Sequence, residues 1–552
     1  SNIKLSNKYL YAFILGENSY IDSNIKDSFQ INGISHLFAI SGMHISLITL
    51  ILLKILDKFK YKYLAIFLFL IFYMFLTSFS HSILRAGIFF IILSLNKIFK
   101  LNFNTINLLL ITLIICLILN PFIIYSVGFQ FSFIISMYLI LLNKLISKYK
   151  SKISSLFIVS LISFLSSMPI VITNFFQINI LSILLNIIFV PYVSIILFPF
   201  SLITFIFPFL DNILYILIQI LEYTSVMCSK IKFLILIYSD INTIFIIIYY
   251  IFITIFLYGL LNNNKYYNIP LILILIIHYN INYFNKYPSI TFIDVGQGDS
   301  IFIKLPNSKG NILIDTGGII NMKKEQWANK NNNYSLGKDT IVSYLKSEGI
   351  KRLDYLIFTH GDNDHMGEAI NILDNIKVRK VLFNNGEYNY LELEVIKILN
   401  EKNINYYKNV EEINIGDNKL YFLNTKTYDN ENDNSNVIYT NINEKKLLFM
   451  GDAGIDTEEN ILKKYNIKEI DILKVGHHGS DTSTSEEFLN ITNPKISLIS
   501  VGKNNRYGHP KNEILEILSN SKIYRTDKDG SIKIKFNKNG YIIETCSPKR
   551  IC

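Results

Sequence analysis

Long apolar runs fill the first half of the chain, and shorter alternating patterns replace them beyond residue 288. Leu, Ile and Phe dominate residues 34–284, whereas Asp, Glu, Lys and Asn become frequent afterwards. A membrane-spanning helix needs roughly 20 mostly apolar residues, and several runs reach or approach that length. The pattern predicts a polytopic α-helical membrane bundle followed by a soluble α/β part.

About ten apolar segments are candidates for spanning helices. The seventh contains Asn186, Pro191 and Pro199, which predict a broken or re-entrant helix. Such breaks are tolerated where the backbone packs on protein or lines a cavity. The candidate spans are 34–54, 63–79, 83–97, 104–120, 123–146, 153–175, 179–207, 211–229, 241–261 and 267–284.

Three parts follow from these patterns. Residues 1–33 are mixed in polarity and predict an interfacial segment. The chain starts at Ser1, and we expect its true N-terminus to be missing. Residues 34–287 form the predicted membrane part, and residues 288–552 form the predicted soluble domain.

Charge is distributed unevenly between these parts. Residues 1–287 carry 18 Lys and Arg against 7 Asp and Glu, whereas residues 288–552 carry 35 against 36. The net positive charge therefore indicates loops on the cytoplasmic side of a membrane rather than a basic nucleic-acid surface. Lysines at 54–62, 97–100 and 144–152 lie on one side of the predicted bundle. With an even number of spans, the soluble domain is expected outside the cytoplasmic (inner) membrane.

Polar side chains recur within the apolar part. They are costly in a membrane and tend to face a bundle interior or a watery path. They predict either a translocation path or hydrogen bonds between helices, with snorkelling to the interface as a further alternative for Arg85. The residues of the candidate path are His36, His44, Arg85, Gln130, Asn174 and Gln177.

Beyond residue 288, strand-like segments come first and then alternate with helices. This order predicts two sheets with helices outside. Four later strands end in loops that carry His or Asp, which suggests a shared edge and a site for one or two divalent metal ions. The candidate metal ligands are His360, Asp362, Asp364, His365, Asp452, His477 and His478. The four cysteines show no metal or redox spacing.

The order of these loops resembles the metallo-β-lactamase fold, an αββα sandwich, and residues 360–365 match its His-x-His-x-Asp-His signature except at Asp362. The chain from about residue 15 to residue 530 also resembles the ComEC family of DNA-internalisation competence proteins. The motifs that carry this resemblance are 36–44, 84–86, 120–121, 128–132, 294–299, 477–480 and 507–510.

The resemblance implies an inner-membrane channel that imports single-stranded DNA, with an external nuclease domain that degrades the other strand. Possible partners are therefore DNA, the membrane and other proteins of the competence machinery. Many family members carry an oligonucleotide-binding barrel before the channel, and we expect that the sequence starts too late to include one. Relatives also place a third histidine ligand before the bridging aspartate. Here residues 434–436, Asn-Ser-Asn, resemble the family's substitute, so occupancy by a single metal or lost nuclease activity stays open.

The expected chemistry is hydrolysis of a phosphodiester with Mn or Zn. Asp362 favours a harder metal such as manganese, although zinc also fits these ligands. Asp452 is the expected bridging ligand, and either His477 or His478 completes the set. Asp364 and His509 are the expected catalytic residues; His509 either assists the scissile phosphate or leaving oxygen or is a structural cap. Two alternatives remain: a DNA transporter with a vestigial hydrolase domain, and a membrane-tethered phosphoesterase with another substrate.

Overall fold

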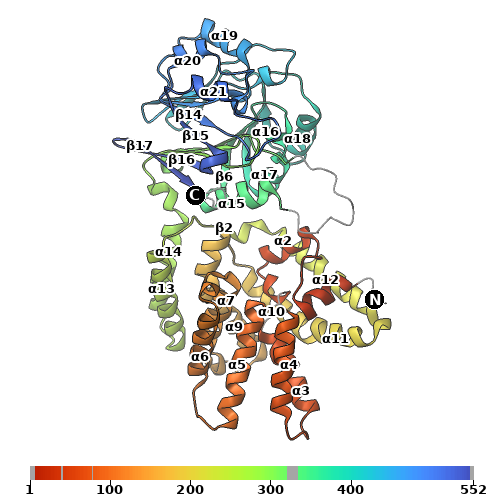
Figure 1. Cartoon of the computed structure of the whole chain (residues 1–552). Coiled ribbons are helices and arrows are strands. Elements are labelled where there is room, and N and C mark those ends of the chain that lie inside the picture. The colour runs from red at the N-terminus through yellow and green to blue at the C-terminus, as the bar shows by residue number, and fades with distance from the viewer. Residues whose placement is uncertain (1–5, 39–41, 78, 320–333, 547–552) are drawn as a thin grey trace. The chain divides into compact units, whose positions relative to one another are not determined.

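The computed structural model describes residues 6–38, 42–77, 79–319 and 334–546. The chain divides into two compact units, the first ending at Ile277 and the second beginning at His278 (Figure 1). The first unit is helical, and its short strands β1 (Gln177–Asn179) and β2 (Ile235–Ile237) pair antiparallel. Its helices are α1 (Asn7–Leu10), α2 (Ser23–Ile31), α3 (Gly42–Ile55), α4 (Lys62–Leu76), α5 (His81–Ile98), α6 (Thr105–Leu119), α7 (Val127–Leu141), α8 (Asn143–Lys148), α9 (Lys152–Phe175), α10 (Ser182–Pro191), α11 (Phe198–Ile206), α12 (Asp211–Ser229), α13 (Thr243–Leu261) and α14 (Ile269–Tyr279).

Four helices in the described part of the chain are long and apolar enough to cross a membrane. They are Lys152–Phe175, Ser182–Ile206, Pro208–Ser229 and Thr243–Leu261. Four shorter apolar helices are His44–Ile55, Lys62–Leu76, Thr105–Leu119 and Val127–Leu141. Large apolar side chains such as Phe75 and Ile118 are exposed on these helices, as expected of surfaces that face lipid.

The predicted count of about ten spans is not confirmed, because several apolar runs contain turns as well as helix. The predicted span 34–54 begins with a turn at Ser35–Leu37, and α3 starts only at Gly42. The predicted span 123–146 is divided between α7 and α8. Hydropathy alone does not distinguish an apolar turn from an apolar helix.

The predicted break in the seventh span takes a milder form. Residues Ser182–Ile206 form one continuous helix, in which α10 and α11 are joined by a π-helical turn at Tyr192–Leu197. Pro191 lacks a backbone N–H, and a wider turn accommodates the lost hydrogen bond. The segment is therefore not interrupted, and the predicted break is wrong.

The second unit contains two mixed sheets packed face to face (Figure 1). The first has the order β17-β16-β3-β4-β5-β6-β7-β8, and the second has the order β15-β14-β13-β12-β11-β10-β9. The strands of the first sheet are β3 (Ser289–Phe292), β4 (Ile301–Lys304), β5 (Asn311–Ile314), β6 (Arg352–Ile357), β7 (Lys377–Leu382), β8 (Asn405–Tyr407), β16 (Ser531–Asn537) and β17 (Gly540–Cys546). Those of the second are β9 (Glu412–Ile415), β10 (Asn418–Phe422), β11 (Ile438–Ile442), β12 (Lys445–Phe449), β13 (Ile472–Lys474), β14 (Ile496–Ile499) and β15 (Lys522–Arg525).

A central apolar layer holds the two sheets together. Phe292 of the first sheet and Phe449 of the second are buried in it, with ring centroids 6.2 Å apart. The outer faces are covered by α15 (Ser343–Ser347), α17 (Ala369–Asn375) and α18 (Tyr390–Glu401) on one side. Helices α19 (Ile455–Lys464), α20 (Glu486–Thr492) and α21 (Asn512–Ile517) cover the other. The predicted pair of sheets with helices outside is confirmed.

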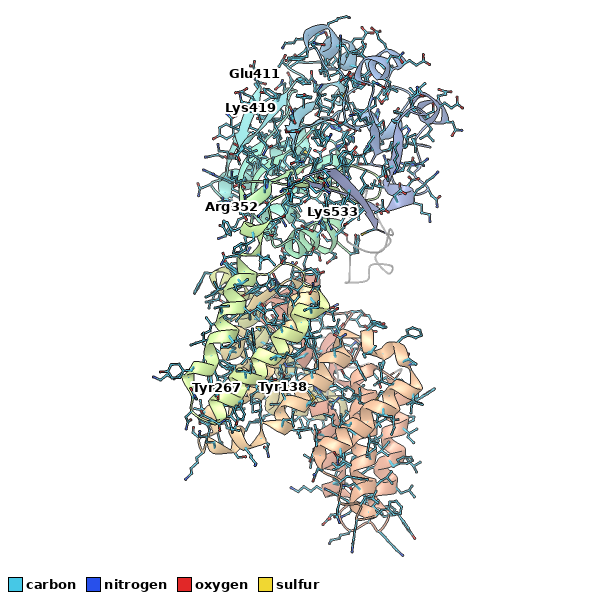
Figure 2. The ribbon with its side chains drawn as sticks, turned by 90° about the vertical axis from the view of Figure 1, so that its left-hand side faces the viewer. Tyr138, Tyr267, Arg352, Glu411, Lys419 and Lys533 are labelled. Carbon is cyan, nitrogen blue, oxygen red and sulfur yellow. The ribbon has the colours of Figure 1, made fainter. Side chains whose placement is uncertain are left out.

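A buried ion cluster links α15 to the first sheet. The Lys304 Nζ lies 3.1 Å from the Glu348 Oε2. Lys533 on β16, which is labelled in Figure 2, contacts the other carboxylate oxygen of Glu348. Burial alone would raise the pKa of Glu348, but the two lysines outweigh burial and hold that pKa below its ordinary value of 4.5. At Lys304 burial dominates and lowers the pKa of the ammonium group. The acid dependence of stability in this cluster is therefore assigned to Glu348.

We expect acid to destabilise the second unit through Glu348. Its pKa is lower in the folded than in the unfolded state, so its contribution is complete above about pH 4.5. That contribution is lost as the pH falls through the folded-state pKa. Glu348→Gln should cost roughly 3 kcal/mol at neutral pH, because it leaves two buried lysines without their carboxylate. Calorimetric unfolding between acidic and neutral pH tests this; an unchanged acid dependence in the variant would contradict it.

Candidate metal centre

Loops that follow strands of both sheets meet at one edge of the sandwich. Parallel strands β5 and β6 lead to Asp315 and to the loop that begins at Thr359. In the other sheet, parallel strands β12 and β13 lead to Asp452 and to the loop that contains His478. Side chains far apart in the sequence therefore converge, as the shared-edge prediction requires.

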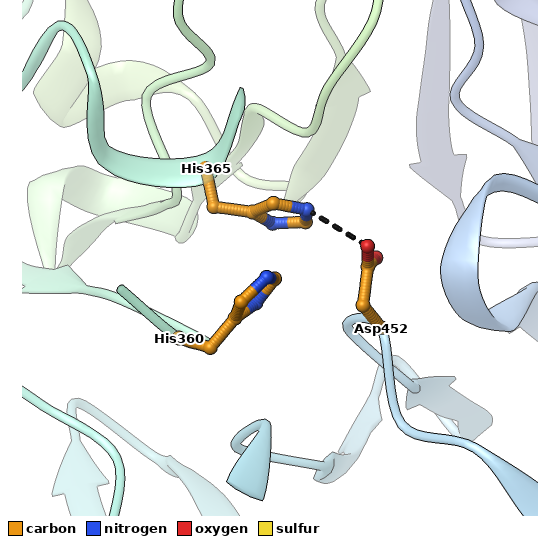
Figure 3. Close-up of side chains that lie close together, drawn as sticks. All are labelled: His360, His365 and Asp452. Carbon is orange, nitrogen blue, oxygen red and sulfur yellow. Dashed lines mark ion pairs between the residues drawn. The ribbon is translucent and has the colours of Figure 1, made fainter. Parts of the chain in front are cut away.

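Asp452 lies at the centre of this convergence. Its Oδ2 is 3.3 Å from the Nε2 of His365 and 3.3 Å from the Nε2 of His478. The Nε2 of His478 is also 3.4 Å from the Oδ2 of Asp364. Figure 3 shows Asp452 facing His365, with His360 beside them. Ligand atoms of Asp364, His365 and His478 lie within 4.8 Å of one another, and Asp452 approaches both of these imidazoles.

His360 and Asp362 lie on a second side of Asp452. The Nε2 of His360 is 3.6 Å from the Oδ2 of Asp362, whose side chain is about half exposed. Ligand atoms of His360, His365 and Asp452 all lie within 4.8 Å of one another. This side offers fewer buried ligands than the side that contains Asp364 and His478.

Residues 434–436 pack against the second side of the site. The Ser435 Oγ accepts a hydrogen bond from the Asp452 backbone N–H at 3.1 Å and lies 3.4 Å from the Nδ1 of His360. Asn436 donates to the Phe358 carbonyl at 2.8 Å. A hydroxyl therefore supports the backbone of Asp452 and lies beside His360 at this side of the site.

Several buried polar atoms of the site lack hydrogen-bond partners, and this favours a bound cation. Within the described residues, the Nε2 atoms of His360, His365 and His478 and the Oδ1 of Asp452 are buried without a partner in hydrogen-bonding geometry. Leaving such atoms unpaired costs free energy. Imidazole nitrogen and carboxylate oxygen are ligands that suit zinc and manganese. A divalent metal would satisfy these atoms together.

The electrostatics of the site also favour positive charge. Burial disfavours protonation of His365, but Asp452 and Asp315 outweigh it and raise its pKa well above the ordinary value. In the same way, burial opposes protonation of His478, and Asp452 and Asp364 raise its pKa to about 10. The carboxylates therefore create a negative potential at the two imidazoles.

Hydrogen bonds to the far side of two imidazoles fix their orientation. The Nδ1 of His365 lies 2.8 Å from the Oδ2 of Asp315, which also accepts the hydroxyl of Thr359 at 2.6 Å. The Nδ1 of His478 lies 2.8 Å from the Ser500 carbonyl. These contacts leave each Nε2 directed at the site, as in other metal centres with an outer ring of hydrogen bonds.

Asp315→Asn is expected to lower metal affinity by about 10- to 100-fold, because His365 loses the carboxylate that orients it. Isothermal titration of the purified chain with Mn²⁺ or Zn²⁺ measures this effect. Asp374→Asn, at the end of α17, is a control with a half-exposed carboxylate. Equal affinities of the Asp315 variant and the unchanged chain would show that Asp315 does not position the ligand.

The neighbouring histidines of the next loop have different surroundings. His478 is buried, whereas the side chain of His477 is 26% exposed and its Nε2 lies 3.9 Å from the Asp452 Oδ2. The Nδ1 of His477 lies 2.9 Å from the Thr482 hydroxyl. The geometry favours His478 as the inner ligand. His509 lies farther out, with its ring 5.9 Å from that of His477, and its catalytic role stays a prediction.

Besides Asp315, two further buried charged residues beside the site were not predicted: Lys474 and Asp299. The Lys474 Nζ is fully buried at the end of β13, donates to the Gly451 carbonyl at 2.9 Å and lies 3.7 Å from the Oδ1 of Asp452. It also forms a close ion pair with Asp299. The sequence contains two signals for them: a lysine inside an apolar strand, and an aspartate that closes the 294–299 motif.

Three residues of the candidate path lie in or near the first helices. The Nδ1 of His36 lies 3.1 Å from the carbonyl oxygen of Gly33. His44 is buried in α3, with its ring 4.4 Å from that of Phe198. Arg85 is buried in α5 and its Nη1 lies 3.4 Å from the Ser136 hydroxyl. The burial of His44 and Arg85 suits either a polar path or packing between helices.

Two of the other three residues have backbone partners close to them in the sequence. Gln130 donates to the Ile124 carbonyl at 2.8 Å, and Asn174 donates to the Ile170 carbonyl at 2.8 Å. Gln177 is in β1, opposite Ile237. The amides of Gln130 and Asn174 thus bond close to their own position in the chain rather than between helices. A role in translocation stays a prediction.

Two families match successive parts of the chain. Residues 13–262 match the Competence protein family, and residues 293–503 match the Metallo-beta-lactamase superfamily. ComE operon protein 3 of Bacillus subtilis (strain 168) is 29% identical over 550 residues, which cover 95% of this chain and 71% of that protein.

Two further relatives match the chain over a shorter length. Recombination protein 2 of Haemophilus influenzae is 30% identical over 268 residues, 47% of this chain and 30% of that protein. Competence protein ComA of Neisseria gonorrhoeae is 26% identical over 269 residues, 46% of this chain and 33% of that protein. The chain thus spans about a third of the length of these two relatives.

Proposed function

Because the chain belongs to the ComEC family, with a competence-protein domain followed by a metallo-β-lactamase domain, we propose that it imports single-stranded DNA during natural transformation. In this proposal the helical unit forms the path through the cytoplasmic membrane. The second unit is a metal-dependent nuclease that degrades the strand that is not transported. The observation that carries the nuclease assignment is the convergence of His365, His478 and Asp364 around Asp452.

Each residue of the site has a proposed role in phosphodiester hydrolysis. Asp364, His365, Asp452 and His478 would hold one divalent ion, and His360 would hold a second ion more weakly. A bound divalent ion supplies Lewis-acid chemistry at a phosphoryl oxygen and a nucleophile at neutral pH. Asp315 holds His365 in orientation, and the buried position of these groups limits access of bulk water.

His509 has the proposed role of assisting the leaving oxygen. Its ring lies at the outer side of His477, at the rim of the site. Burial and the neighbouring histidines His477 and His478 lower the pKa of His509, so the ring is mainly neutral at physiological pH. A neutral imidazole donates a hydrogen bond to a phosphate oxygen without a charge of its own.

We place the second unit outside the cytoplasmic membrane. A nuclease that removes one strand has to meet DNA before the other strand enters the channel. The family and the apolar helices are consistent with a membrane location. Proteolysis of intact protoplasts tests the placement: cleavage of the second unit by added protease is expected, and its full protection would refute an external location.

The nuclease assignment is tested with the whole chain purified in detergent. Single- and double-stranded oligonucleotides are incubated with Mn²⁺, Zn²⁺ or a chelator. We expect cleavage with at least one metal and none with the chelator. Failure to cut with either metal would refute the nuclease and would favour a vestigial hydrolase domain that serves as a docking module, while leaving transport intact.

Transport is tested through Arg85, whose buried guanidinium lies near Ser136 and Phe133. Arg85→Ala is expected to reduce transformation at least about tenfold, because a buried cation inside a bundle suits passage of an anion. DNA cleavage by the same variant should be unchanged. Lys97→Ala, an exposed lysine at the end of the same helix, is the control. Normal transformation with normal amounts of the Arg85 variant in the membrane would contradict the assignment.

A further inference from the structure

The loop at 502–511 is held in shape by a single side chain. The Asn505 amide donates to the Gly502 carbonyl at 3.1 Å and to the His509 carbonyl at 2.6 Å. Its oxygen accepts the backbone N–H groups of Tyr507 at 3.2 Å and His509 at 3.0 Å. Four hydrogen bonds from one amide give the loop a defined tip before any ligand binds, which reduces the cost of ordering it.

Both ends of this loop are anchored beside the metal centre. The Gly502 N–H donates to the Gln297 side chain at 3.2 Å. At the other end, the Lys511 N–H donates to the Gly479 carbonyl at 2.9 Å, and Gly479 directly follows His478. The tip is therefore attached to the same loop that supplies an inner ligand.

The tip exposes an aromatic ring among cations. Tyr507 is 46% exposed, and the Arg506 guanidinium lies 4.9 Å over its ring centre. Residues 502–511 contain Lys503, Arg506 and Lys511 and no acidic residue. The whole span 288–552 is close to neutral, with 35 basic and 36 acidic residues. The loop is thus a local basic patch on a domain without an overall basic surface.

A series of rings connects this tip to the metal centre. The Tyr507 ring is nearly parallel to that of His509, at 12° and with centroids 5.9 Å apart. The His509 ring is 5.9 Å from that of His477, whose Nε2 is 3.9 Å from the Asp452 carboxylate. A strand whose phosphate lies at Asp452 would therefore bring a neighbouring base within reach of Tyr507.

We propose that residues 502–511 form a subsite for single-stranded DNA, in which Tyr507 stacks on a base and Lys503 and Arg506 neutralise adjacent phosphates. Stacking on an aromatic ring combined with a cationic contact to the backbone is the usual mode of sequence-independent recognition of single strands. This subsite rests on the proposed nuclease function and specifies its substrate: unpaired bases beside the scissile phosphate. The same chemistry at a bilayer would bind anionic lipid headgroups, but the connection to Asp452 favours DNA.

Binding is measured with the full chain in detergent and with chelator present, so that no cleavage occurs. The probes are a fluorescent single-stranded oligonucleotide and an abasic strand of equal length. Tyr507→Leu should weaken binding of the normal strand about tenfold and leave binding of the abasic strand unchanged. Tyr507→Phe, which keeps the ring, should bind like the unchanged chain. Tyr390→Leu replaces an exposed tyrosine of α18 and is the matched control.

A second variant tests the cation. Arg506→Gln should weaken binding of both strands and reduce the salt dependence of binding by about one phosphate contact. Equal binding of the normal strand by Tyr507→Leu and the unchanged chain would overturn the subsite. If Tyr507→Leu weakened binding of the normal and abasic strands equally, the subsite would also be overturned. The same holds if this variant lost binding only to vesicles of phosphatidylglycerol and not to DNA.

The two proposals fail in different ways. Absence of cleavage with any metal, together with base-dependent binding at Tyr507, refutes the nuclease and retains the subsite as a DNA-binding surface. Metal-dependent cleavage with a KM that Tyr507→Leu leaves unchanged refutes the subsite and retains the nuclease. Circular dichroism and metal content of each variant establish that the fold is intact.

Discussion

Asp452→Asn is expected to abolish DNA cleavage, with a loss of about a thousandfold or more. The Oδ2 of Asp452 lies 3.3 Å from the ligand nitrogens of both His365 and His478, so it is the carboxylate common to the converging ligands. Removing its charge weakens every ion held there, and metal ions contribute several kcal/mol to such reactions. The measurements are metal content by mass spectrometry and the rate of oligonucleotide cleavage.

The matched control for this variant is Asp456→Asn. Asp456 is exposed in the first turn of α19, four residues beyond Asp452. It should retain both metal content and activity. If Asp452→Asn kept its metal and cut DNA at the normal rate, the assigned centre would be wrong, whatever the result for the control.

Lys474→Met is expected to destabilise the second unit by about 3–5 kcal/mol, because the buried carboxylate of Asp299 loses its partner. The test is calorimetric unfolding of the purified chain in chelator, which removes any compensation by bound metal. The double variant with Asp299→Asn should recover much of this loss, since both charges are then absent. A single variant as stable as the unchanged chain, or a double variant no better than the single one, would contradict a stabilising ion pair.

The residues of the candidate metal centre could be predicted because they follow strands that the hydrophobic pattern identifies. Apolar runs that end at Phe358, Met450 and Val475 are each followed within two residues by His or Asp. Carboxyl ends of neighbouring parallel strands meet at one edge, so these side chains were expected to converge. Asp299, Asp315 and Lys474 were missed as members of the site, because a single charged residue after or within a strand has no characteristic spacing.

The choice between two adjacent histidines could not be made from the sequence. Both His477 and His478 have positive φ angles, 42° and 55°, a backbone conformation that is uncommon for residues other than glycine. This turn directs the Nε2 of His478 at Asp452 and leaves His477 partly exposed. A preference for one ring over its neighbour depends on backbone angles that no residue pattern encodes.

In the first half of the chain, the type of element could be predicted from the sequence, but the number and ends of the helices could not. Its composition predicts membrane helices, and four long apolar helices are present among the described residues. Their number and ends were not predictable, because turns such as Pro121–Tyr125 are as apolar as the helices they join. The length of a span depends on where the helical pattern of backbone hydrogen bonds begins and ends. Apolar composition does not specify these positions.

The residues from His360 to His365 and the order of later loops were enough to predict a two-sheet domain with a candidate metal site, next to an apolar helical unit. Those properties follow from alternation along strands and from the types of ligand atoms, which are local in the sequence. Only the tertiary structure decided that Asp452 is shared by His365 and His478, that Asp315 and Lys474 support the site, and that Tyr507 stands at its rim. These are contacts between distant segments, and packing of the two sheets brings them together.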